Sequence, residues 1–180
     1  MKAYIRGTVF NVDGTLRSDG EFKEAHSFVG NFILSLYAAF SATAVTMLSW
    51  GNSQLPNTGV NVNPLQVKAA ANDTSYGILI GSGTTAPSMS DHALGTQITT
   101  NVYHQTVGFA VNSPNASTIE MMIMRSFMNN TGSALTINEV GLVVYNSSTG
   151  NLFLIDHTLY TVVVPAGGAI AMTYKFTITL

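Results

Sequence analysis

The last twelve residues of the chain, 169–180, alternate between apolar and small or polar side chains. The apolar residues take every second position, opposite a face made mostly of threonine: Ile170, Met172, Tyr174, Phe176, Ile178 and Leu180. A period of two residues directs successive side chains to opposite faces of a strand. The segment therefore predicts an antiparallel strand with one face against a core and the other toward solvent.

Comparable segments follow one another from residue 43 onward, separated by clusters of Asn, Gly, Ser, Thr and Pro. Strands are predicted at 43–49, 60–70, 76–81, 97–111, 118–128, 135–146, 152–164 and 169–180. Frequent strands with short turns favour a mainly β fold, an antiparallel β-sandwich or a jelly-roll-like arrangement. A length of 180 residues indicates a single domain, 1–180.

The N-terminal segment, residues 1–20, contains Asp13-Gly14 between two segments of strand character, 2–12 and 15–18. An Asp-Gly pair between strands is typical of a type I′ hairpin turn, which needs positive φ at both central residues. Eight of the sixteen charged residues lie in the first 24 positions. We expect this segment to form a hairpin that serves as a docking arm.

From about Glu21 to Ala42 the apolar residues recur at intervals of three and four. This spacing predicts one N-terminal α-helix over about 21–42, with Ser18 or Asp19 as its cap. We therefore expect the domain to contain a hairpin arm at 1–20, a helix at 21–42 and a β-sandwich at 43–180.

The uncharged run from Ser27 to Trp50 is long enough to span a bilayer. However, Ser27, Asn31 and Ser35 recur every four residues and would form a polar stripe along the helix. A helix with two different faces suits packing against protein better than contact with lipid. We expect no membrane span.

Charged residues make up only 9% of the chain, against about 25% in an average globular protein. A free monomer normally carries a denser charged surface. The composition favours a subunit whose surface is covered by its neighbours, with a neutral, hydroxyl-rich β-domain as the alternative. The net charge of −2 suggests neither nucleic-acid binding nor attraction to a membrane, and the lack of cysteine excludes disulfides and thiol catalysis.

The segment from Gly81 to Ala86 matches the dinucleotide-binding pattern G-x-G-x-x-G/A. That pattern binds pyrophosphate where it opens a helix in a βαβ unit, with an acidic residue about 20 positions later. Here Pro87 follows at once, Asp91 is too near and Glu120 is too far. We therefore expect no cofactor.

We expect the same segment to be a rigid turn that leaves a strand. Gly81 and Gly83 would supply positive φ, and Pro87 would stiffen the loop. A following serine would cap a short helical turn, with Asp91 favourably placed at its positive end.

No set of residues indicates catalysis or metal binding. The segment 10–16 resembles the nucleophile motif of haloacid-dehalogenase-type phosphatases, but Asn11 stands where that chemistry needs a carboxylate. The four histidines lack metal-ligand spacing. In the pairs Asp91-His92 and Asp156-His157, neighbouring side chains on a strand would point to opposite faces. We expect that the protein is not an enzyme.

Arg125 and Glu139 are the only charged residues between positions 121 and 155. A hairpin closed by residues 130–133 would place them opposite each other, among apolar neighbours. We predict a buried or interface ion pair that fixes the register, with two exposed partners as the alternative.

Five blocks of the chain resemble, in the same order, segments found in virion proteins of tailed bacteriophages. They are Ala25-His26-Ser27-Phe28-Val29, Ile80–Pro87 with Asp91 and Leu94, Arg125-Ser126-Phe127 with Asn129, Glu139-Val140-Gly141-Leu142, and Val164-Pro165-Ala166-Gly167 through Tyr174. The first block departs from the usual pattern, which has His-Asn where this chain has His26-Ser27.

The resemblance implies a non-enzymatic, β-rich structural component of a phage particle, located in the virion after assembly in the host bacterial cytoplasm. It is compatible with a head-fibre or capsid-associated protein and with a tail or baseplate subunit. The expected partners are copies of the chain, in a trimer or a ring, and other virion proteins.

A carbohydrate- or receptor-binding β-domain of a phage fibre is the alternative function, with a host-surface glycan as its partner. Lectin sites generally use an exposed aromatic platform. Trp50, beside Gly51-Asn52-Ser53, is the only obvious candidate, and a structural aromatic residue is the favoured interpretation.

Overall fold

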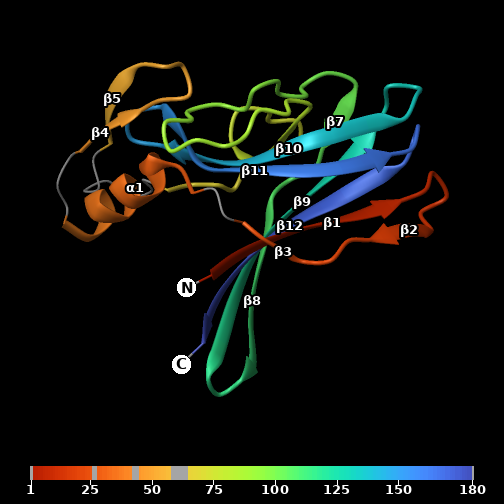
Figure 1. Ribbon diagram of the computed structural model, residues 1–180, viewed down its shortest axis with the longest axis horizontal. Helices are drawn as coiled ribbons and strands as arrows, with labels where there is room; N and C mark the ends of the chain where they lie inside the picture. The colour runs from red at the N-terminus through yellow and green to blue at the C-terminus, as the bar shows by residue number, and fades with distance from the viewer. Residues whose placement is uncertain (1, 26–27, 42–44, 58–64, 180) are drawn as a thin grey trace.

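The computed structural model describes residues 2–25, 28–41, 45–57 and 65–179 (Figure 1). Within these residues the chain is mainly β, with antiparallel sheets and very little helix. The single helix described, α1, covers Gly30–Ser41.

The largest sheet has seven strands, with the central order β2-β1-β12-β9-β7, while β3 pairs with β1 and β8 with β9. Its strands are β1 (Lys2–Phe10), β2 (Leu16–Asp19), β3 (Lys23–Glu24), β7 (Val102–His104), β8 (Gly108–Asn115), β9 (Thr118–Asn129) and β12 (Ala169–Thr179). A second sheet has the order β11-β10-β6, built from β6 (Gly77–Gly81), β10 (Leu135–Asn146) and β11 (Asn151–Val164). A two-stranded sheet pairs β4 (Val45–Leu48) with β5 (Gln54–Asn57).

The core lies where the seven-stranded and three-stranded sheets face each other. Apolar side chains from both sheets form one cluster, including Ile5, Phe127 and Tyr174 from the first and Leu142 and Phe153 from the second. Figure 1 shows β10 and β11 lying over the strands β1, β12 and β9. The shared cluster buries apolar side chains of both sheets, in keeping with the alternating patterns.

The strand predicted from the alternation at the end of the chain is confirmed as β12, which pairs antiparallel with β1 on one side and β9 on the other. Ile170, Met172 and Tyr174 are buried, whereas Phe176 is half-buried and Ile178 is exposed. The apolar face of this strand thus extends beyond the part that the second sheet covers.

The other predicted strands are found with two differences. The segment 97–111 contains two short strands, β7 and part of β8, separated by residues 105–107. The segment 60–70 forms no strand among the residues described there, 65–70, and residues 60–64 of that prediction lie outside the described residues. Gln66 makes an isolated bridge with Tyr145.

The N-terminal hairpin is present between β1 and β2, but the type I′ turn is wrong. Only Gly14 has positive φ, whereas a type I′ turn needs it at Asp13 as well. Gly14 donates a hydrogen bond to Asn11, and the Asp13 carboxylate accepts from the backbone and hydroxyl of Thr15. The aspartate closes the turn with its side chain and keeps an ordinary backbone conformation.

The predicted start of the helix at residue 21 is also wrong, because α1 begins at Gly30. Residues 23–24 form β3 on the edge of β1, and Ala25 donates a hydrogen bond to the carbonyl of Ala3. Pairing with an open strand edge therefore overrides the helical spacing of the apolar residues. No helix in the described part of the chain has the length and apolar character needed to cross a bilayer.

Candidate functional site

Arg125 and Glu139 are both buried, as predicted, but they do not form an ion pair. Arg125 lies in β9 of the seven-stranded sheet, and Glu139 lies in β10 of the three-stranded sheet. Residues 130–134 pass from one sheet to the other and close no β9–β10 hairpin. The expected pairing is wrong because β12 flanks β9 in the first sheet, while β6 and β11 flank β10 in the second.

The Arg125 guanidinium donates to five backbone carbonyls. Its Nε donates to Gln105 at 2.8 Å, Nη1 to Tyr76 at 3.2 Å and Ile78 at 3.0 Å, and Nη2 to Ala70 at 3.2 Å and Asp73 at 2.5 Å. A guanidinium carries five N–H donors, so each has an acceptor. Arg125 therefore joins β9 to the irregular segment 70–78, which precedes and enters β6.

Burial is the main influence on the pKa of Arg125 and lowers it, while the nearby Asp73 and Tyr76 act in the opposite direction. A buried cation without a carboxylate partner is expensive unless its donors are satisfied. Here carbonyl dipoles take the place of a counter-ion, and all of them except that of Ile78 belong to residues outside the strands.

Both oxygens of the Glu139 carboxylate have hydrogen-bond partners, which lie in the loop 82–96 and in β11. Its Oε1 accepts from the backbone of Gly83 at 2.9 Å and Thr96 at 2.8 Å, and its Oε2 accepts from Gly95 at 2.9 Å. The ring Nε2 of His157 lies 3.0 Å from the same Oε2. One side chain of β10 thus fixes both ends of the loop 82–96.

Burial alone would raise the pKa of Glu139, but the hydrogen bonds from Thr96, Gly95 and Gly83, together with His157, outweigh burial and lower it. Glu139 is therefore held as a carboxylate. An anion surrounded by backbone N–H donors resembles an anion-binding loop, except that the anion here is part of the protein.

Gly81 and Gly83 are needed for a reason that differs from the prediction. Neither has positive φ. Instead, a Cβ on Gly83 would lie 2.5 Å from Oε1 of Glu139, and a Cβ on Gly81 would approach the same atom even more closely. The two glycines leave room for the Glu139 carboxylate, which explains the G-x-G pattern without a ligand.

Asp91 and His157 meet, although no local pattern in the sequence indicates that distant loops bring them together. Asp91 Oδ2 lies 2.7 Å from Nδ1 of His157 and also accepts from the backbone of Ser88 at 2.8 Å. The expected serine-capped turn is present as a single turn: the Asp91 N–H donates to the Ser88 carbonyl, and the Ser90 N–H donates to the Ser88 hydroxyl. Pro87 lies half-buried in this loop.

His157 bridges two carboxylates, Asp91 and Glu139. Nδ1 of the ring faces Asp91, and Nε2 faces Glu139. Because the carboxylates lie on opposite ring nitrogens, the three groups do not converge on one point. Among the described residues, no group of three or more His, Asp or Glu side chains is arranged to hold a metal ion.

Asn129 performs the same kind of task and was not identified from the sequence. Its amide donates to the carbonyls of Ser133, Val164 and Pro165, and its Oδ1 accepts from the backbone and hydroxyl of Thr131. Asn129 thereby connects the crossing between the sheets to the turn before β12. Its position in the block that follows Arg125 was the available signal.

A second buried carboxylate connects the two sheets. Asp156 in β11 accepts from the hydroxyls of Tyr174 at 2.7 Å and Thr158 at 3.0 Å. Burial raises the pKa of Asp156, and burial beside this carboxylate raises the pKa of Tyr174 well above its usual range. Both groups are fully buried.

Trp50, the candidate platform for a glycan, is half-buried and packs against a small core cluster that includes Val29 and Leu79. Its backbone N–H donates to the carbonyl of Leu152. These contacts describe a structural aromatic residue.

Comparisons with known proteins find no match to this chain among family models, curated proteins or solved structures.

Proposed function

We propose that this chain is a non-enzymatic structural component of a tailed-bacteriophage virion, which acts by oligomerising and by contacting capsid or tail proteins. The proposed fold is an antiparallel β-sandwich of the seven-stranded and three-stranded sheets, with α1 on its outside. The proposed location is the virion, after assembly in the host bacterial cytoplasm.

One observation carries the proposal: the buried polar residues of the phage-like blocks make their hydrogen bonds within the protein. Arg125, Asn129 and Glu139 each direct their polar atoms at backbone groups, and Asp91 reaches Glu139 through His157. A catalytic site needs such groups to point at a reacting atom. Side chains that bind backbone groups in this way serve to hold the fold, and a rigid framework is what an assembly subunit needs.

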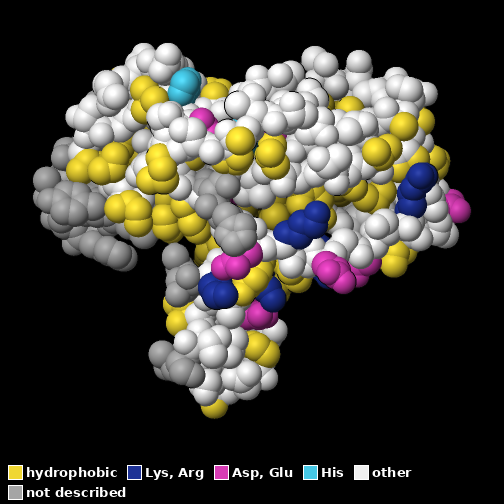
Figure 2. Space-filling model, in the orientation of Figure 1, with side chains coloured by type: hydrophobic (Ala, Val, Ile, Leu, Met, Phe, Trp, Pro, Cys, Tyr) yellow, Lys and Arg dark blue, Asp and Glu magenta, His cyan; other side chains and the backbone are white. Residues whose placement is uncertain are grey.

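The surface supports the same proposal. Figure 2 shows few charged side chains on the visible face, most of them near the junction with the lower projection and at the right-hand end, with uncharged surface over most of the rest. Neutral surface of this extent suits burial against other copies of the chain or other virion proteins, because a free monomer normally carries a denser charged surface. The alternative role in glycan binding gains no support, because Trp50 packs against the protein core.

The proposal is tested on particles from a bacterial culture in which the phage carrying this gene is produced. Particles are purified on a density gradient, and their proteins are identified and counted by peptide mass spectrometry. We expect this chain to migrate with the particles in many copies, at a constant ratio to the major capsid protein. Recovery of the chain only outside the particle fractions would overturn the proposal.

A further inference from the structure

A part of the seven-stranded sheet extends beyond the three-stranded sheet and keeps an apolar face there. We name this part the stalk and define it as residues 108–122 and 176–179, which are β8, the first half of β9 and the end of β12 (Figure 1). In the body the same face of the sheet forms the core. In the stalk no element among the described residues covers it fully.

The strand register shows that the apolar side chains of the stalk share one face. Directly opposed residues lie on the same side of an antiparallel sheet, and the pairs here are Val111 with Met121, Met121 with Phe176, and Ile119 with Ile178. The stalk face consists of Phe109, Val111, Ile119, Met121, Phe176 and Ile178. Val111 is 73% exposed, Ile119 58% and Ile178 52%.

The charges lie on the other side of the same strands. Glu120 and Lys175 form an ion pair at 3.2 Å, and Lys175 also lies over the rings of Tyr4 and Phe22. Because these residues alternate with the apolar ones along β9 and β12, the stalk face itself carries no charged side chain.

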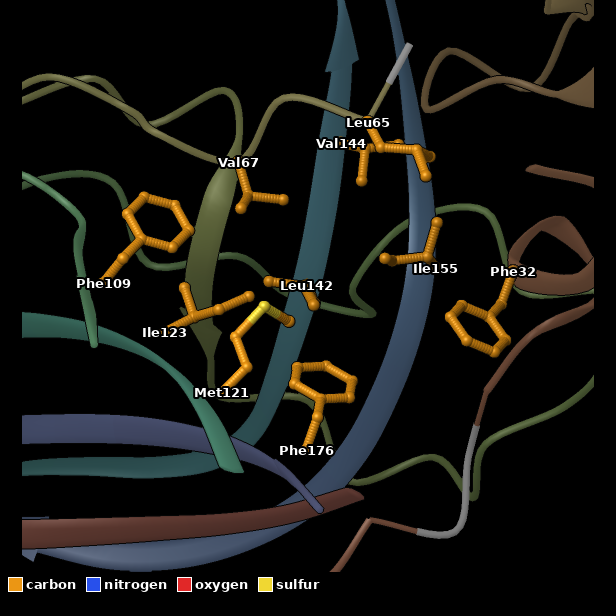
Figure 3. A pocket seen from close by; sticks show the side chains of 10 residues that line it. All are labelled: Phe32, Leu65, Val67, Phe109, Met121, Ile123, Leu142, Val144, Ile155 and Phe176. Atoms are coloured by element: carbon orange, nitrogen blue, oxygen red, sulfur yellow. The ribbon is translucent and has the colours of Figure 1, made fainter. Parts of the chain in front are cut away.

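An apolar pocket of about 320 Å³ continues the stalk face into the body. Figure 3 shows its side chains pointing toward a common space from both sheets, with Phe109, Met121 and Phe176 of the stalk on one side. All ten side chains that line it are apolar. A site for a small ligand normally includes a few polar groups that orient it, so the pocket is better described as part of the interface surface.

We propose that the stalk face is a self-association interface, which packs against the same face of a second copy of this chain. The inference rests on the proposed assembly role and names the surface that performs it. A face without charges meets its own copy without like-charge repulsion, and it offers a different partner no charged group to select.

The geometry of sheets suits this contact. Two sheets pack face to face about 10 Å apart with their inner side chains interdigitated. In a symmetric oligomer the same patch meets itself, so a single set of apolar side chains serves both partners. The contact would repeat between copies what the two sheets already do within the chain.

The test compares the molar mass in solution, by light scattering, of the wild type, the double variant Val111→Asp/Ile119→Asp and the control Val12→Asp. Val12 is 71% exposed, as is appropriate for a match to Val111, but it lies in the β1–β2 turn. We expect an oligomeric wild type and control, and a double variant whose association is weakened at least 100-fold. Circular dichroism and thermal unfolding show whether each variant is folded.

A cross-linking experiment keeps the inference testable if the double variant fails to fold. The chain contains no cysteine, so Val111→Cys and Val12→Cys each introduce a single thiol. A bis-maleimide that spans about 10 Å, the spacing of packed sheets, should join two copies through position 111 and not through position 12.

The two proposals fail in different ways. An oligomer that resists the double substitution and does not cross-link at position 111 overturns the stalk interface and leaves the virion role standing. A monomeric wild type at all concentrations also overturns the interface. Absence from purified particles, with the stalk contact intact in solution, would overturn the virion role alone.

Discussion

The carboxylate of Glu139 occupies the space that a side chain on Gly83 would need, since a Cβ on Gly83 would lie 2.5 Å from Oε1 of Glu139. The same oxygen accepts the Gly83 N–H at 2.9 Å. The glycine is therefore required by a carboxylate from another sheet strand, 56 positions further along the chain.

This relationship predicts that Gly83→Ala is strongly destabilising. The methyl group must displace a saturated, buried carboxylate, and we expect a loss of about 2–4 kcal/mol in the free energy of unfolding. Gly95→Ala is the matched control in the same loop, because its Cβ would lie 3.6 Å from Glu139 Oε2, an ordinary contact. Urea unfolding of both variants measures the difference, and equal stabilities would contradict this account.

Replacing Glu139 with glutamine tests the same cluster from the other side. The amide keeps the size but turns one acceptor into a donor that faces backbone N–H groups of the loop. We expect Glu139→Gln to cost about 2–4 kcal/mol. Asp91→Asn, at the partly exposed edge of the cluster, should cost clearly less. Similar losses for the two variants, measured by thermal unfolding, would refute the central place of Glu139.

Arg125→Lys should behave as a damaging substitution although it keeps the charge. Lysine has three donors in place of five and lacks the planar fork that reaches several carbonyls at once. We expect a loss of about 3–5 kcal/mol, because carbonyls are left without donors and a buried cation is poorly solvated. Arg17→Lys, at an exposed position in β2, is the control and should change stability by less than about 0.5 kcal/mol.

The lowered pKa of His104 predicts that the protein loses stability in mild acid. Burial, assisted by the charge of Arg125, lowers the pKa of His104 from 6.5 to about 4. Below pH 6.5 the unfolded chain binds a proton that the folded chain does not, so stability falls as the pH drops from about 6.5 to about 4. The full loss from this group is about 3 kcal/mol.

The lowered pKa of Glu139 acts in a separate window, because its contribution is present above pH 4.5 and is lost as the pH falls through its lower folded value. His104→Leu should therefore flatten the stability profile between pH 6.5 and 4 and leave the fall at lower pH in place. An unchanged slope between pH 6.5 and 4 would contradict the assignment to His104.

The strands could be predicted from the sequence because alternation is a local property. The bounds of β10 and β12 agree closely with the alternating segments, and Asp13-Gly14 marks a hairpin. The order of strands in the sheets is not local. For that reason Arg125 and Glu139 were placed opposite each other, although their strands belong to different sheets.

The hydrogen-bond partners of the buried polar residues could not be predicted from the sequence either. Arg125 binds carbonyls of residues 70–78, and Glu139 binds N–H groups of residues 83–96. These partners are backbone groups, so the identity of the side chains at those positions does not reveal them. No local pattern relates His157 to Asp91, because they are 66 positions apart. A charged residue isolated in an apolar strand did indicate burial, but it could not indicate that its partners were backbone groups.

The central claim, that this chain acts by assembling, is tested most directly by sedimentation velocity of the unmodified full chain over a wide range of concentrations. We expect a discrete oligomer of defined size that persists as the protein is diluted toward the micromolar range. A single monomeric species at every concentration, up to the highest that can be prepared, would contradict it.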